Sequence, residues 1–177
     1  MKQYEGRYLN LKNRINEHFS KLTGLDTDFF SKMKQADIIQ LKTVFADINN
    51  VLTLKLTNEA AVWLCKYFEI DEKNKKAILT RIDAVKPNSK GFDIVIEEPY
   101  KIIAEVKCTS TVNDGGAFGA AQHDSIMDDV YKLVYGKKNF QRVDGFFKFL
   151  CLIDLGNRTD QAIQQLLRKT GGKSEKA

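Results

Sequence analysis

The chain has 177 residues, of which 43% are hydrophobic and 29% are charged, and it carries a formal net charge of +5. This balance predicts one domain that can bury a hydrophobic core, alone or with a small helical addition, and excludes a disordered or fibrous chain. The basic excess is compatible with a nucleic-acid partner, because lysine and arginine neutralise phosphates, but charge alone does not decide this.

Two amphipathic helices are predicted at the N-terminus. Residues 4–22 and 28–48 both place apolar side chains at intervals of three and four, as one face of a helix requires. We expect Gly24 to end the first helix, and Asp26 or Asp28 to cap the second. Residues 1–50 are therefore predicted to form a helical annex.

Residues 51–169 are predicted to form the main domain, and residues 170–177 a disordered tail. A helix is expected to begin near Asn58, with Thr57 or Asn58 as its cap. Three strands should follow as an antiparallel meander, at 77–85, 92–96 and 101–109.

The last part of the main domain is predicted to contain a helix, a strand and a helix. The helix at 122–135 follows a glycine-rich loop, 112–121, that is expected to be mobile and either to close over a substrate or to enter a groove. The apolar strand at 146–153 should be buried on both faces, and Thr159 should cap a helix at 160–167. The fold class that follows is α/β, with a mixed central β-sheet flanked by helices.

The three cysteines, Cys65, Cys108 and Cys151, are far apart and form no C-x-x-C pair. This spacing argues against a disulfide framework or a zinc cluster and favours reduced thiols. The N-terminus lacks the apolar core of a signal peptide, and no apolar run reaches the length of a membrane span. We therefore expect a cytoplasmic protein with no membrane partner.

The predicted hairpin around Pro99 carries the residues with the clearest chemistry. Glu105 and Lys107 are two positions apart, so their side chains point to the same face of a strand. If the hairpin is centred on Pro99, Asp93 lies directly opposite Glu105, with Cβ atoms roughly 4.5–5.5 Å apart. A turn shorter by one residue would move Asp93 to the other face.

Two carboxylates this close repel each other, so one must take up a proton or a cation must lie between them. Their oxygens suit Mg²⁺, with Mn²⁺ as a substitute, and the carbonyl of Val106 could complete the metal shell. The ion would polarise a scissile phosphate and lower the pKa of a bound water. Lys107 would orient that water or stabilise the developing negative charge.

The pattern Gly91-Phe92-Asp93, then eleven residues, then Glu105-Val106-Lys107 resembles the PD-(D/E)xK, or restriction-endonuclease-like, nucleases. The resemblance extends from about residue 58 to residue 167, although Phe92 stands where the pattern has proline. It implies a restriction-endonuclease-like core and a Mg²⁺-dependent endonuclease that hydrolyses DNA, as part of a restriction or other defence system.

The resemblance also implies roles for individual residues. Asp93 and Glu105 would bind Mg²⁺, and Lys107 would be catalytic. Family members often carry a further acid on the helix before the sheet, which would be Glu59. Some carry a glutamine on the helix after the lysine, which would be Gln122.

Simpler interpretations of these residues stay open. Glu105 and Lys107 could form a solvated ion pair on a surface hairpin. The apolar residues around them favour a central strand instead, where a charge needs a partner. Glu59 could be an acid in the first turn of a helix, and Gln122 an ordinary residue at a helix start.

Two other classes of function are compatible with the sequence. One is a nucleic-acid-binding module that does not cut, and the other is a protein-interaction domain built on the helical annex. DNA is the expected partner, and an RNA or a nucleic-acid junction as substrate is also open. A homodimer, or a partner subunit or domain, is also open, because cutting both strands of a duplex with one site favours a two-fold pair.

Overall fold

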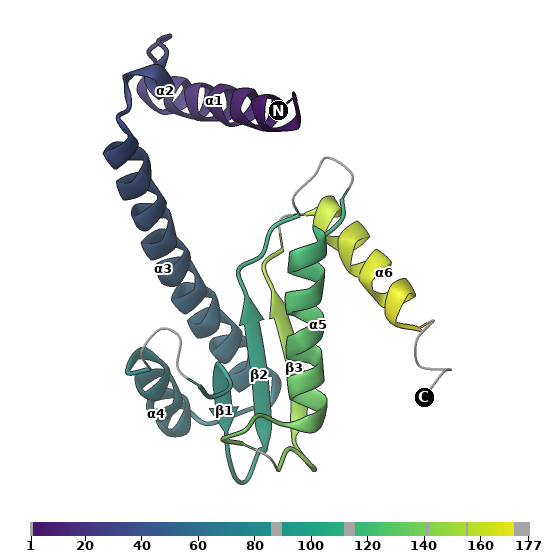
Figure 1. The fold of residues 1–177 in the computed structure, drawn as a ribbon. Helices are drawn as coiled ribbons and strands as arrows, with labels where there is room; N and C mark the ends of the chain where they lie inside the picture. The colour runs from purple at the N-terminus through teal and green to yellow at the C-terminus, as the bar shows by residue number, and fades with distance from the viewer. Residues whose placement is uncertain (1, 86–89, 112–115, 141, 155, 172–177) are drawn as a thin grey trace. The chain divides into compact units, whose positions relative to one another are not determined.

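The computed structural model describes residues 2–85, 90–111, 116–140, 142–154 and 156–171 (Figure 1). Residues 112–115 of the glycine-rich loop, and the tail from residue 172, lie outside the described residues. The chain divides into two compact units, 1–48 and 49–177. None of the helices in the described segments is long and apolar enough to cross a membrane.

The N-terminal unit contains α1 (Lys2–Thr23), α2 (Phe29–Lys32) and the first part of α3 (Gln35–Tyr67). Gly24 ends α1 as predicted, with a φ of +70° and an N–H that donates to the carbonyl of Ser20. Asp28 caps α2, because its carboxylate accepts the N–H of Ser31 at 3.0 Å.

The prediction of a single helix over 28–48 is wrong. The chain leaves α2 at Met33, whose backbone is extended, and α3 begins two residues later. The carboxylate of Asp37 accepts the N–H of Lys34 at 2.7 Å. This bond satisfies a backbone donor at the new helix start, where no intrahelical partner exists.

The predicted helix start at Asn58 is also wrong, because α3 runs unbroken through this position. The Thr57 hydroxyl donates to the carbonyl of Thr53 at 2.8 Å instead of capping a helix. Asn58 donates to the Asp83 carboxylate at 2.8 Å. Residues 35–67 contain no glycine or proline, and each residue added to a growing helix gains a hydrogen bond.

A helix, α4 (Glu72–Asp83), replaces the strand predicted at 77–85. Asp71 caps it by accepting the N–H of Asn74 at 3.0 Å. Ile78 and Ile82 lie one turn apart on its buried side. A short apolar run does not by itself distinguish strand from helix. The charged residues before the run form the first turns of α4, so the predicted three-stranded meander is reduced to a hairpin.

The sheet has three strands among the described residues, β1 (Ile94–Ile96), β2 (Ile102–Lys107) and β3 (Phe147–Leu152), in the order β1-β2-β3. β1 pairs antiparallel with β2, and β2 pairs parallel with β3. The α/β class with a mixed sheet is therefore confirmed, as is the central place of the strand that carries Glu105.

The helix α5 (Ala120–Tyr135) connects β2 to β3, and α6 (Asn157–Gly171) follows β3. The prediction that the last strand is buried on both faces is wrong. β3 lies at the edge of the described sheet, and Phe147 is 56% exposed. Thr159 does not cap the last helix, since it lies inside α6.

The two faces of β2 have different surroundings. Ile102, Ala104 and Val106 pack in a buried cluster with residues of α3 and α4, such as Leu64 and Ile78. Ile103 belongs to a second cluster that includes Leu133 of α5. Because side chains alternate along a strand, Glu105 and Lys107 share the face of Ile103. Figure 1 shows α5 lying along this sheet.

Leu64→Ala tests the larger cluster. Leu64 is fully buried, so truncation leaves a cavity, and we expect the free energy of unfolding to fall by about 2–5 kcal/mol. The matched control is Val62→Ala, which shortens an exposed side chain of the same helix. Denaturant unfolding followed by circular dichroism measures both, and equal losses would contradict the assignment of this core.

Candidate active site

The register of the β1–β2 hairpin determines which charged residues meet. Ile94 pairs with Ala104, Val95 with Ile103, and Ile96 with Ile102. These pairs centre the hairpin on position 99, as the sequence predicted.

Extending the same register by one residue places Asp93 opposite Glu105. The Oδ2 atom of Asp93 accepts the N–H of Val106 at 2.8 Å. This bond holds the Asp93 carboxylate at the end of β1, against the central strand.

Glu105 is a buried acid, with 4% of its surface exposed. Burial raises its pKa to about 7, from an ordinary value of 4.5, because the charged form loses its hydration. A hydrogen bond from Lys137 opposes this rise, whereas the negative charges of Asp93 and Asp129 add to it. The local field therefore favours a bound cation beside Glu105.

In this structure the cation beside Glu105 is the ammonium of Lys137. Its Nζ forms an ion pair with Glu105 Oε1 and donates to the carbonyl oxygen of Gly91 at 2.6 Å. It also lies 4.7 Å from the centre of the Phe92 ring, in cation–π geometry. The site residues predicted from the sequence do not include this lysine.

A local signal for Lys137 exists in the sequence. Gly136 ends α5 with a φ of +90°, a conformation that favours glycine. The chain turns there, and the next residue is directed back toward the sheet. A lysine directly after a helix-ending glycine is thus a candidate partner for a buried acid, but the sequence does not identify which acid.

Lys107 is held by α5. Its Nζ lies 2.8 Å from Asp129 Oδ2 and donates to Ser125 Oγ at 3.0 Å. Ser125 and Asp129 are four residues apart, so both lie on one face of the helix. Asp129 is itself only 4% exposed and also pairs with Lys132 at 3.0 Å.

Asp129 is a second site residue that sequence reasoning missed. Its signal is an acid inside the apolar stripe of α5, three residues after Ile126 and four before Leu133, which are both buried. A charge in such a stripe needs a partner. The sequence alone does not show that this partner is Lys107.

The structure does not bring Glu59 to the Asp93–Glu105 pair. Glu59 is an exposed residue of α3 and lines a cleft of about 280 Å³ together with Trp63, Val106 and Cys151. This cleft is on the α3 side of β2, whereas Glu105 shares the α5 side with Lys107. A metal-binding role for Glu59 stays a prediction.

Gln122 acts at the start of α5. Its Oε1 accepts the N–H of Gly119 at 3.0 Å, and its Nε2 donates to the carbonyl of Ser110 at 3.0 Å. The first bond satisfies the N–H of the residue that caps α5, and the second ties the helix start to the segment after β2. They give Gln122 a structural role, and its catalytic role stays a prediction.

Asp93, Glu105 and the backbone of Val106 suit Mg²⁺ better than a metal ion whose ligands are all protein side chains. No group of three or more His, Cys, Asp or Glu side chains with metal-binding geometry occurs within the described part of the chain. Asp93 and Glu105 form a pair of acids beside the backbone of Val106. Mg²⁺ usually needs only one or two protein carboxylates, because waters and substrate phosphates supply its other ligands.

Comparison of the chain with models of protein families, with curated proteins and with solved structures finds no match. The interpretation of the site therefore depends on its residues and their geometry.

Lys137→Met removes the cation that faces Glu105. An acid left unpaired in a buried site is costly, so we expect the free energy of unfolding without metal to fall by about 3 kcal/mol at alkaline pH. The loss should be small in acid and grow as the pH rises through about 7, because the protonated carboxyl of Glu105 needs no cation.

Denaturant unfolding in EDTA over a range of pH measures this loss. Lys138→Met is the control, since Lys138 is exposed and adjacent in sequence, and its effect should stay within about 0.5 kcal/mol. A loss in Lys137→Met that does not change with pH would contradict the pairing with Glu105.

Proposed function

We propose that the chain is a Mg²⁺-dependent endonuclease with a restriction-endonuclease-like core, and that its substrate is DNA. The observation that carries this proposal is the arrangement on the central strand. The buried Glu105 lies opposite Asp93 in the hairpin register, and Lys107 follows on the same face. Function is argued from this site, because one fold can support many activities.

In the proposed site, Asp93 and Glu105 hold the metal. The Val106 N–H positions the Asp93 carboxylate through one oxygen, so that this side chain needs little rearrangement to bind a cation. When bound, Mg²⁺ would polarise the scissile phosphate and lower the pKa of an attacking water.

Lys107 is the proposed catalytic lysine. Asp129 and Ser125 hold its ammonium in place through contacts of 2.8 and 3.0 Å. A charged donor that is already oriented can stabilise negative charge on the phosphate without reorganising during the reaction. Asp129 therefore acts in this proposal as a positioning residue for Lys107.

The proposed partner is DNA, on the basis of the net charge of +5 and the D…E-x-K pattern. Lysines and arginines bind phosphates without reading sequence, so this charge supports binding and gives no recognition sequence. A place in a restriction or other defence system is supported by the resemblance in that pattern.

A second candidate function is a nucleic-acid-binding module that does not cut. The observation that favours it is that the buried acids already have lysine partners, Lys137 for Glu105 and Lys107 for Asp129. A cluster balanced in this way is stable without a metal. This alternative predicts DNA binding with no metal-dependent hydrolysis.

Cleavage of plasmid, linear duplex and single-stranded DNA in Mg²⁺, Mn²⁺ or EDTA tests the proposal. We expect cutting in both metals and none in EDTA, with a loss of at least about 100-fold in Lys107→Met and Asp93→Asn. Lys101→Met is the matched control, because it changes a lysine of the same hairpin whose partner is Glu98. DNA binding without cutting would favour the second candidate.

Mn²⁺ binding, measured by calorimetry, separates the metal site from the catalytic lysine. Asp93→Asn keeps an oxygen that can accept the Val106 N–H but removes the charge, so we expect Mn²⁺ binding to be lost. Lys107→Met should still bind Mn²⁺. Equal Mn²⁺ binding by wild type and Asp93→Asn would exclude this acid as a ligand.

A further inference from the structure

The helix α1 carries a seam with a seven-residue repeat, in which every residue except His18 is apolar or aromatic. Its spacings alternate between four and three residues over the length of the helix. The seam consists of Tyr4, Tyr8, Leu11, Ile15, His18 and Leu22. A repeat of this kind is typical of helices that pack along one another with interlocking side chains.

The first half of α3 carries a second seam with the same repeat. The seam consists of Ile38, Leu41, Phe45, Ile48 and Leu52. Other apolar residues of α3, such as Ile39, lie on the opposite side of the helix, because they are out of phase with this repeat.

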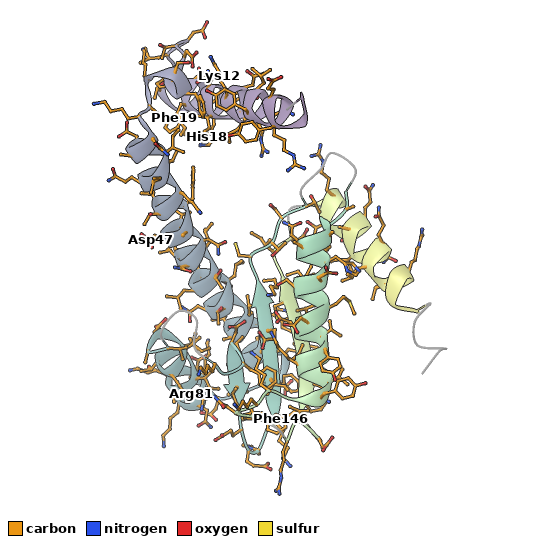
Figure 2. The ribbon with its side chains drawn as sticks, in the orientation of Figure 1. Lys12, His18, Phe19, Asp47, Arg81 and Phe146 are labelled. Atoms are coloured by element: carbon orange, nitrogen blue, oxygen red, sulfur yellow. The ribbon has the colours of Figure 1, made fainter. Side chains whose placement is uncertain are left out.

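The middle of each seam lines a groove that the described residues of the N-terminal unit do not fill. The groove has a volume of about 500 Å³, and its apolar lining includes Leu11, Ile15 and Phe19 from α1 and Leu41 and Phe45 from α3. Figure 2 shows His18 and Phe19 on the side of α1 that faces α3. The two helices therefore form the arms of an open V. Its inner surface combines these apolar side chains with Arg14, Glu17, His18 and Lys21.

The N-terminal unit also lacks a core of its own. Among its described residues, Phe30 is the one buried apolar side chain. Tyr4, Tyr8 and Phe45 are 76%, 48% and 51% exposed, so they alone leave roughly 350 Å² of aromatic surface uncovered. A unit of this size needs a partner to bury enough apolar surface.

We propose that the groove is filled by a second copy of this chain, so that two V-shaped pairs of α1 and α3 interlock into a four-helix bundle. Each copy has both a groove and a helix that can fill one. A two-fold axis between the copies therefore fills both grooves through the same contact. The exposed aromatic residues and half-exposed leucines of the seams supply much of the about 800 Å² per partner that a stable interface buries.

The charges beside the α1 seam disfavour contact between the α1 helices of two copies. Arg7, Arg14 and Lys21 form an exposed basic row at seven-residue spacing beside the α1 seam. Two α1 helices side by side would bring these rows together, and like charges across such a seam repel. Of the two acids in residues 35–48 of α3, Asp37 lies beside the seam, whereas Asp47 lies on the opposite side of the helix. We therefore place α1 of one copy against α3 of the other.

The oligomeric state of the full chain tests this proposal, independently of any nuclease activity. By light scattering after size exclusion, the wild type should have about twice the 20.2 kDa mass of one chain. Leu11→Lys and Phe45→Glu place a charge in the groove, and each should raise the dimer dissociation constant at least about 30-fold.

Leu9→Lys and Ile39→Glu are the matched controls, because they add the same charges on exposed sides of the same helices and should remain dimeric. Circular dichroism checks that all variants keep their helix content. A monomeric wild type would overturn the proposal and leave the groove to a different protein. Dimers that persist in both groove variants, or that the controls lose equally, would also overturn it.

Mixing the two monomeric variants tests the crossed arrangement. If α1 meets α3 of the other copy, a mixed dimer places Lys at position 11 of one chain near Glu at position 45 of the other, and leaves the second contact unchanged. We expect dimer to return in the mixture and not in either variant alone. No return of dimer would exclude the α1–α3 pairing between copies.

Discussion

The ion pair between the buried Glu105 and Lys137 connects the central strand to the end of α5. A carboxylate buried on a central strand is stable as an ion only if a positive charge lies beside it. Lys137 supplies that charge, and it reaches Glu105 because Gly136 ends α5 and turns the chain toward the sheet. The end of α5, its packing on the sheet and the position of β2 are thereby linked through one ion pair.

Because side chains alternate along β2, the residues that pack in the core and the charged residues of the candidate site lie on opposite faces of the strand. Ile102, Ala104 and Val106 point to one face of β2 and pack against α3 and α4. Glu105 and Lys107 face α5, which supplies Asp129. A substitution on the first face therefore acts through packing, and one on the second acts through charge. The strand can carry both functions only because it is covered on both sides.

Lys137 and a divalent cation satisfy the same requirement at Glu105, since either can compensate the charge that burial and Asp93 make costly. The two proposed functions differ mainly in the cation that lies beside Glu105. In the proposed endonuclease it would be Mg²⁺, and in the non-cutting binding module it would be the ammonium of Lys137. In the N-terminal unit, the corresponding feature is the apolar groove between α1 and α3, which the residues described in that unit leave unfilled.

The sequence by itself determined the α/β class, the end of α1 at Gly24 and the hairpin register that opposes Asp93 to Glu105, because each follows from local turn chemistry or side-chain alternation. It did not determine that residues 72–83 form a helix, since a short apolar run fits either periodicity. Only the tertiary structure decided that Asp129 and Lys137 join the site. These two residues are 22 to 32 positions from their partners Lys107 and Glu105, and only the packing of α5 on the sheet brings such distant charges together.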